Sequence, residues 1–187
     1  MESLRHNYKP QFYEKLRTHG SNFAEIIIPM LCKKKKIKTV LDVGCGNGSF
    51  LLKCLELGCR VRGFDGRHVI KNLLIPANRF TVKNLQNKFE IKNKYDLVVT
   101  LEVAEHLDKK YKDNFIDSLC MAGDMILFSA AQVGQPGIHH VNCQPLEYWI
   151  NEFSKRGFIF DIETTGYMRL IEIHGWYRRN AMLFYRV

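Results

Sequence analysis

The chain has 187 residues, of which 46% are hydrophobic and 25% are charged. This length and composition are typical of one globular domain and exclude a disordered or collagen-like chain. Lysine and arginine outnumber aspartate and glutamate by 28 to 19, and the formal net charge of +9 favours anionic partners. Part of the excess lies in the lysine-rich stretch 33–38. We interpret this stretch as a solvated linker, with a phosphate or nucleic-acid contact as the alternative.

The sequence predicts no membrane association and no metal. Residues 1–15 lack the apolar core of a signal peptide. No apolar run reaches the roughly 18 residues that a membrane helix needs. We therefore expect a cytoplasmic protein. The six cysteines form no CxxC pair, so neither a zinc site nor a redox motif is indicated, and the thiols are expected to be reduced.

Two short helices are predicted first, at residues 11–18 and 21–31, with Ser21 as the N-cap of the second. We expect them to form a helical cover, residues 1–38, over one end of a sheet that occupies residues 39–187. No internal repeat or linker divides the chain, so both parts are expected to belong to a single domain.

From Thr39 onward, short apolar runs alternate with helix-like stretches. Seven strands are predicted, at residues 39–43, 60–64, 79–85, 95–101, 124–130, 158–163 and 181–187. Strands separated by helical patterns form βαβ units, so the predicted fold class is α/β: a doubly wound, Rossmann-like, mostly parallel sheet with helices on both faces. Residues 164–180 show no convincing helix, which favours an antiparallel pairing of the last two strands at the sheet edge.

A glycine-rich turn follows the first strand. Gly44, Gly46 and Gly48 lack a Cβ, so the backbone can turn sharply and approach a ligand before a helix begins near residue 49. Asp42 would repel a pyrophosphate but attract a positively charged ligand. S-adenosylmethionine carries a sulfonium and an ammonium group, so we predict that this loop, Cys45 included, binds it.

Polar residues also follow the next two strands. Asp65 and Gly66 end the second strand, and Asp65 lies 19 residues after the second loop glycine, near the spacing at which a carboxylate reaches ribose hydroxyls. Asn84 and Leu85 end the third strand and are expected at the edge and the face of an adenine. A nicotinamide cofactor is disfavoured because Ser49 replaces the third glycine of that fingerprint.

The fourth and fifth strands lead into further polar segments at the same edge. Glu102, Glu105 and His106 follow the fourth strand. His106 could act as a base, although histidines in such turns more often serve structural hydrogen bonds. The long loop after the fifth strand carries a cluster suited to recognising and deprotonating a hydroxyl or amine. Its members are Gln132, Gln135, His139, His140, Asn142 and Gln144. Paired histidines indicate a metal only where further ligands are found.

Together these residues resemble the class I S-adenosylmethionine-dependent methyltransferases, whose glycine motif is matched by Val40-Leu-Asp-Val-Gly-Cys-Gly-Asn-Gly. Further segments resemble a narrower group of mainly bacterial methyltransferase-domain proteins, among them Leu101-Glu-Val-Ala-Glu-His-Leu, Phe128-Ser-Ala-Ala, His140-Val-Asn and Trp176-Tyr-Arg-Arg-Asn. The resemblance implies contacts to the methionine side from Asp42, Gly44, Gly46 and Gly48, to the ribose from Asp65, to the adenine from Asn84 and Leu85, and to the far edge of the cofactor from Glu102. The family often has an aspartate where this chain has Asn84.

These observations predict an O-methyltransferase that acts on a small-molecule or sugar acceptor. His140, or else His106, would take the acceptor's proton. The acceptor pocket is predicted to include His139, Asn142, Tyr148, Trp149 and Arg178.

Two alternatives stay open at this point. The net charge and the basic and aromatic residues 176–179 favour an RNA or other nucleic-acid methyltransferase, although no Asp/Asn-Pro-Pro-aromatic motif follows the fourth strand. The other alternative is a protein that binds S-adenosylmethionine without catalysis. The sequence predicts no oligomeric state.

Overall fold

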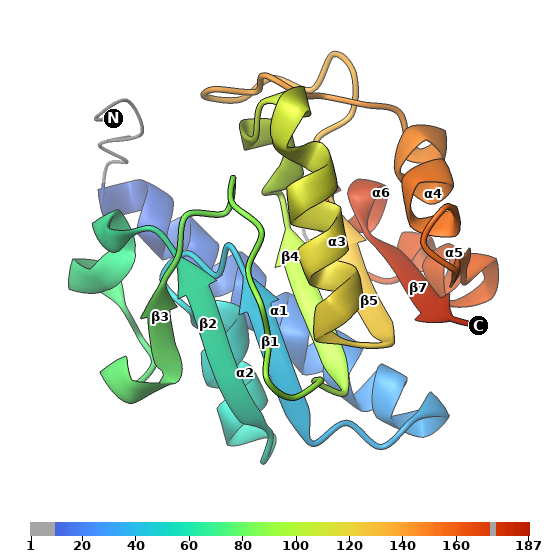
Figure 1. The fold of residues 1–187 in the computed structure, drawn as a ribbon. Coiled ribbons are helices and arrows are strands. Elements are labelled where there is room, and N and C mark those ends of the chain that lie inside the picture. Colours follow the sequence, from blue (N-terminus) through green and yellow to red (C-terminus); the bar gives the residue numbers. More distant parts are fainter. Residues whose placement is uncertain (1–9, 173–174) are drawn as a thin grey trace.

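The computed structural model describes residues 10–172 and 175–187. Seven strands form one sheet in the order β3-β2-β1-β4-β5-β7-β6 (Figure 1). The strands are β1 (Thr39–Val43), β2 (Arg60–Asp65), β3 (Phe80–Val82), β4 (Leu97–Leu101), β5 (Met125–Ser129), β6 (Phe158–Phe160) and β7 (Met182–Arg186). The first five strands are parallel, whereas β7 is antiparallel to both of its neighbours, β5 and β6. The predicted doubly wound, mostly parallel sheet is confirmed.

Helices cover both faces of this sheet. They are α1 (Pro10–Lys34), α2 (Ser49–Glu56), α3 (Lys112–Ala122), α4 (Leu146–Ser154), α5 (Ile162–Leu170) and α6 (Gly175–Asn180). In Figure 1, α1 and α2 lie behind the sheet and α3 lies in front of it. Neighbouring strand residues point to opposite faces. Accordingly, Val40 packs with α1 and α2, whereas Leu41 packs with α3. No helix in the described parts of the chain is both long and apolar enough to cross a membrane.

The prediction of two short N-terminal helices was wrong. Residues 10–34 form one helix that runs through Gly20, where a Cβ would lie 2.5 Å from the Ser49 Oγ atom of α2. The glycine therefore allows α1 to pack closely on α2, and this packing outweighs the low helix propensity of glycine. Ser21 is not an N-cap, because it lies inside the helix and its hydroxyl donates to the Ser49 carbonyl at 3.3 Å.

The segment 164–180 also differs from the prediction, because it contains most of α5 and all of α6 in its described part. Asp161 caps α5, and its Oδ1 atom accepts a hydrogen bond from the Thr164 amide at 2.8 Å. An aspartate directly before a helix is a recognisable N-cap in a sequence. The strands β6 and β7 nevertheless pair antiparallel, as expected.

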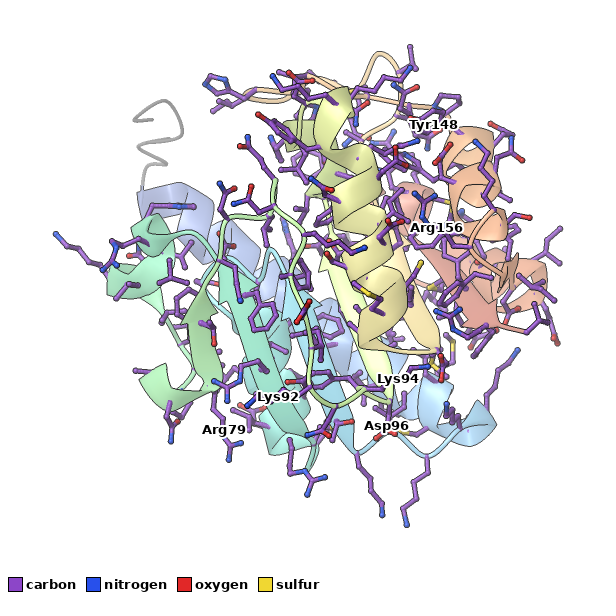
Figure 2. All side chains as sticks on the ribbon, in the orientation of Figure 1. Arg79, Lys92, Lys94, Asp96, Tyr148 and Arg156 are labelled. Atoms are coloured by element: carbon purple, nitrogen blue, oxygen red, sulfur yellow. The ribbon has the colours of Figure 1, made fainter. Side chains whose placement is uncertain are left out.

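A network of ion pairs holds α4 against α3. The Glu152 carboxylate is 5% exposed and accepts three hydrogen bonds. The donors are Lys112 at 2.7 Å, Lys155 at 2.7 Å and Arg156 at 3.1 Å. Arg156 lies between the two helices and also pairs with Asp113 and Asp117 of α3, each at 2.6 Å (Figure 2). The network fixes the helix into which the long loop after β5 leads.

This network predicts a pH-dependent contribution to stability. Burial raises the pKa of Glu152, but the hydrogen bonds from the three basic side chains outweigh burial and lower the pKa to about 2. A group whose pKa is lower in the folded state than in the unfolded state stabilises the fold at pH values above its ordinary pKa. This stabilisation is lost as the pH falls toward the folded-state pKa. Glu152→Gln should therefore lower the free energy of unfolding at pH 7 by about 2 kcal/mol. It should also flatten the decline in stability between about pH 5 and pH 2, measured by urea denaturation.

Glu163→Gln is the matched control, because the Glu163 side chain is 88% exposed and pairs with Lys34 at 3.5 Å. We expect this variant to change stability by less than about 0.5 kcal/mol. Equal losses of stability in the two variants would contradict the assignment of this stabilisation to the buried Glu152 network.

Candidate active site at the carboxyl edge of the sheet

The glycine loop between β1 and α2 packs on the turn that follows β4. Gly44, Gly46 and Gly48 have φ angles of 84°, 55° and 79°, in the left-handed region that favours glycine. A Cβ at Gly44 would lie 2.3 Å from the Cγ2 atom of Val103. The close approach of these two segments therefore depends on the absence of a side chain at Gly44.

Asp65, at the end of β2, ties this loop to the second strand. Its carboxylate accepts hydrogen bonds from the Gly46 amide at 2.7 Å and from the Gly66 amide at 2.6 Å. His68 Nε2 lies 3.8 Å from the same carboxylate. Burial raises the pKa of Asp65, and the two amides oppose that effect.

Asp42, near the end of β1, is 4% exposed. Burial, and then the charge of Asp65, raise its pKa well above the ordinary range. No lysine or arginine in the described part of the chain forms an ion pair with Asp42 or Asp65. The buried Asp42 carboxyl and the half-buried Asp65 carboxyl, without such a partner, favour a ligand that brings its own positive charge, so these residues fit S-adenosylmethionine.

Three of the predicted cofactor contacts have side chains that do not line the glycine loop: Cys45, Asn84 and Leu85. The Cys45 side chain is 5% exposed and packs in the core on the α1 face, so only its backbone belongs to the loop. β3 ends at Val82, earlier than predicted. Asn84 is exposed and accepts a hydrogen bond from the Gln86 amide at 3.1 Å, which stabilises a turn, and Leu85 packs against the core on the α3 face. Their adenine contacts stay predictions.

Glu102 is the centre of a hydrogen-bond network after β4. Its carboxylate accepts from Asn180 Nδ2 and from Gln135 Nε2, each at 3.1 Å. Asn180 is fully buried, and its Oδ1 atom accepts from Gln132 Nε2 at 3.0 Å. The network joins the turn after β4, the loop after β5 and the end of α6.

The loop between β5 and α4 docks on the same turn, and in Figure 1 it crosses above β4 and α3. The Val141 and Asn142 amides donate to the Glu105 carbonyl at 2.9 and 3.0 Å, and the Asn142 side chain donates to the Ala104 carbonyl at 3.3 Å. Glu102 and His139 are the non-glycine residues with positive φ among the described residues, and both belong to these two segments. Such backbone strain is common at functional sites.

Docking brings the two predicted base candidates together. The rings of His106 and His140 have centroids 5.1 Å apart, edge to face. His106 Nδ1 lies 3.2 Å from the His139 carbonyl and His140 Nδ1 lies 3.1 Å from the Gln135 carbonyl. Glu105 is fully buried beside them, and burial and the charge of Glu102 raise its pKa to about 8 against the effect of nearby backbone amides.

The predicted acceptor-binding residues do not form one set. His139 and Arg178 are exposed, and Tyr148 is half-buried, with Lys109 Nζ 5.6 Å from its ring centroid. Asn142 is buried and serves the docking of the loop. Trp149 is 1% exposed and packs on Phe128 with ring centroids 5.1 Å apart. This position removes Trp149 from the acceptor pocket, because an indole enclosed in the core cannot contact a ligand.

Three residues of this edge were not assigned a role from the sequence. They are Glu105, Asn180 and Tyr177. The Tyr177 ring stacks on Phe23 of α1 at 5.0 Å, and burial and the charges of nearby acids, Glu102 first, raise the pKa of Tyr177. Asn180 is 78 residues from its partner Glu102. No local pattern signals a contact between residues so distant in sequence.

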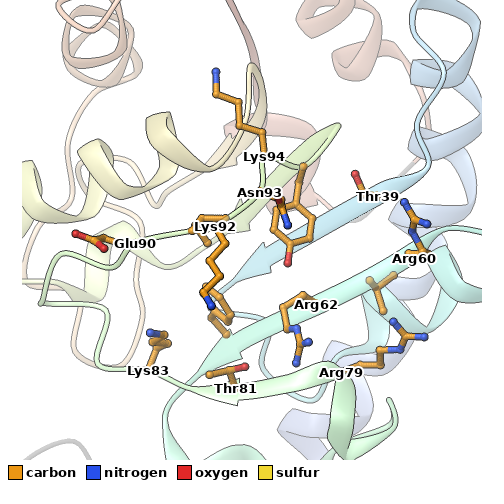
Figure 3. Close-up of a pocket in the computed structure, with 14 residues that line it drawn as sticks. Thr39, Arg60, Arg62, Arg79, Thr81, Lys83, Glu90, Lys92, Asn93 and Lys94 are labelled. Atoms are coloured by element: carbon orange, nitrogen blue, oxygen red, sulfur yellow. The ribbon is translucent and has the colours of Figure 1, made fainter.

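A separate groove of about 580 Å³ lies on the face of β2 and β3 (Figure 3). Arg60 and Arg62 point to this face because alternate residues of a strand share a side, and no helix between β3 and β4 covers it. The basic residues that line it are Arg60, Arg62, Arg79, Lys83, Lys92 and Lys94, with Glu90 as the acidic one. None of the lining residues belongs to the glycine loop.

Comparisons with known proteins agree with this geometry. Residues 13–122 match the sequence model of a methyltransferase domain, whereas no curated protein sequence matches the chain. The sugar N-methyltransferase KedS8 from Streptoalloteichus superposes with a TM-score of 0.72 at 10% identity, covering 96% of this chain and 93% of that one. Magnesium protoporphyrin IX methyltransferase from Synechocystis, crystallised with S-adenosylmethionine, has a TM-score of 0.66 at 16% identity, with 97% and 86% covered. Human N-acetylserotonin methyltransferase has a TM-score of 0.60 at 14% identity, with 94% and 55% covered.

The strand order, the glycine loop after β1 and the acid at the end of β2 define an S-adenosylmethionine-dependent methyltransferase. The matched domain spans more than half of the sequence, and the chain belongs to this methyltransferase-domain family.

The glycine loop gives a prediction with a matched control. Gly44 and Gly58 both have a φ of 84°, but a Cβ at Gly58 would meet nothing within 4 Å. Gly58→Ala should therefore lose only about 1 kcal/mol from left-handed strain. Gly44→Ala adds the displacement of Val103 and should lose at least about 2 kcal/mol more. Urea denaturation of both variants measures the difference, and equal losses would show that the loop does not need to approach Val103.

Proposed function

We propose that this enzyme transfers the methyl group of S-adenosylmethionine to a hydroxyl group of a small-molecule or sugar acceptor. The observation that carries the proposal is the position of the His106 and His140 pair, which lies beside the Glu102 turn against which the glycine loop packs. Similar folds in enzymes that methylate porphyrin, sugar and N-acetylserotonin acceptors support a small acceptor.

The donor would be held by residues of four strand ends. We assign the methionine side to Asp42 and the glycine loop, the ribose to Asp65 and the far edge to Glu102, with Asn84 and Leu85 toward the adenine. When bound, S-adenosylmethionine supplies a methyl carbon that is activated by its positive sulfur. Asp42 and Asp65 favour that charge.

The acceptor side has to orient a hydroxyl oxygen toward the methyl carbon and to remove its proton. The oxygen forms the new bond to carbon as the carbon–sulfur bond breaks, and the electron pair of that bond stays on sulfur. The proton is lost at the histidine pair. Because a carbonyl oxygen only accepts, we assign a proton to Nδ1 of each ring and the proton-accepting role to Nε2. We also assign His139, Arg178 and Tyr148 to the acceptor side.

This proposal predicts a separation between donor binding and methyl transfer. His106→Ala and His140→Ala should each lower transfer on the order of a hundredfold, with little change in affinity for S-adenosylhomocysteine. Asp65→Asn should instead lower that affinity about tenfold, because it removes a charge that accepts two amides. Transfer is measured with methyl-labelled donor on fractionated pools of sugars and hydroxylated small molecules, and affinity by calorimetry. Full activity in both histidine variants would contradict the assignment of the acceptor side.

The basic groove on β2 and β3 favours a second candidate, a nucleic-acid methyltransferase. Six basic side chains and one acidic side chain line the groove, and this excess of positive charge attracts phosphates. The groove lies apart from the glycine loop, so a nucleic acid bound there would have to extend to the carboxyl edge of the sheet.

Charge reversal tests this candidate. If the groove binds nucleic acid, the double variant Arg60→Glu with Lys92→Glu should lower affinity for a single-stranded RNA oligonucleotide by at least about tenfold at low salt and reduce its salt dependence. The double variant Lys35→Glu with Lys36→Glu makes the same change of charge in the exposed lysine-rich stretch. Equal effects of the two double variants would assign the binding to net charge and not to the groove.

A further inference from the structure

Three side chains with metal-binding atoms converge at the carboxyl edge of the sheet. Glu105, His106 and His140 each offer one such atom, and the three atoms lie within 4.8 Å of one another. An ion at their centre would lie within about 2.8 Å of each atom, so small side-chain movements bring all three to bonding distances of about 2.0–2.2 Å. The docking of the β5–α4 loop on Glu105 and Ala104 holds this arrangement, because it fixes the backbone on both sides.

Glu105 supplies an independent observation that points to a ligand. Its side chain is fully buried, and neither carboxyl oxygen has a hydrogen-bond partner of good geometry, although backbone amides lie near it. No described lysine or arginine forms an ion pair with it, and the charged side chain that shifts its pKa most, Glu102, is also acidic. A buried carboxylate in such surroundings is costly unless it takes up a proton or a cation compensates its charge.

Both histidines make the backbone contact that metal-binding histidines usually make. Metal-binding histidines commonly donate one ring N–H to a carbonyl or carboxylate, which fixes the tautomer and turns the other nitrogen toward the ion. His106 and His140 each place Nδ1 at a backbone carbonyl, at 3.2 and 3.1 Å. This pattern occurs in both rings, and the rings belong to two segments that are distant in sequence.

We propose that Glu105, His106 and His140 bind a divalent first-row transition-metal ion. Two imidazole nitrogens and one carboxylate favour such an ion over Mg²⁺ or Ca²⁺, which prefer oxygen ligands. Three protein ligands leave coordination positions open for a water or an acceptor oxygen. No local sequence pattern indicated a metal, because the ligands beyond the paired histidines come from a different part of the chain.

A function for the ion follows, and this part rests on the proposed methyl transfer. An acceptor hydroxyl bound at an open position would have a lowered pKa and would lose its proton near neutral pH. In the metal-loaded enzyme His106 and His140 would hold the ion, and the acceptor's proton would pass to solvent instead of to the histidine pair. Glu102, beside Glu105 and next to the glycine loop, would connect the ion to the donor site.

The test uses the whole chain, freed of metal with a chelator, and Mn²⁺ as the probe. Mn²⁺ avoids thiolate ligands, which matters because the chain has six cysteines. Titration followed by electron paramagnetic resonance should show one bound ion per chain. Glu105→Gln and His140→Ala should each weaken that binding by at least about tenfold. Val133→Ala is the control from the same loop, because the Val133 side chain is 72% exposed and offers no ligand atom, and it should bind Mn²⁺ as the unmodified protein does.

Two further measurements keep the outcome decisive. Calorimetry with S-adenosylhomocysteine reports whether each variant keeps its donor site, so a loss of Mn²⁺ binding alone can be separated from misfolding. Pulsed resonance spectra of the Mn²⁺-loaded unmodified protein should show coupling to histidine nitrogen. No bound Mn²⁺, no nitrogen coupling, or unchanged binding in both ligand variants would overturn the metal site. Donor binding without methyl transfer to any acceptor pool would instead contradict the proposed function and leave the metal result standing.

Discussion

The site depends on one contact, in which the β5–α4 loop docks on the turn after β4. Two successive loop amides, of Val141 and Asn142, donate to the single carbonyl of Glu105. Because β4 and β5 are parallel neighbours, both carboxyl ends reach the same edge, and the loop that leaves β5 has to pass the turn that leaves β4. Backbone hydrogen bonds between the two segments therefore set the separation of His106 and His140.

The charges of the molecule are divided between two surfaces. The chain as a whole is strongly basic, yet acidic side chains collect at the carboxyl edge: Asp42, Asp65, Glu102 and Glu105. The basic side chains of β2 and β3 gather in a different groove, on a face that no helix covers. The edge thus suits a positively charged donor, whereas the groove suits anions. Net charge alone gives no information on either surface, because it sums over both.

The sequence predicted those features that depend on short-range patterns. Apolar runs located all seven strands, and the glycine loop with Asp42 and Asp65 indicated the donor site. Patterns of this kind did not reveal that α1 continues through Gly20. The helix continues there because Gly20 packs on Ser49 of α2, a contact between residues distant in sequence. Nor did short-range patterns assign Glu105 or Asn180, whose importance comes from contacts across 36 or more residues and from complete burial. Trp149 was predicted in the acceptor pocket because the sequence does not show which face of α4 is buried.

The antiparallel strand explains how the C-terminal part of the chain completes the site. β7 runs against β5, with Met182 paired to Phe128, so β7 starts at the edge where the parallel strands end. The helix that precedes it, α6, must therefore also finish at that edge. This places Asn180 within hydrogen-bonding distance of Glu102 and allows Tyr177 to stack on Phe23 of α1. A parallel seventh strand would start at the opposite edge and would carry both residues away from the acids. The direction of one strand thus decides whether the first and last helices can close over the same site.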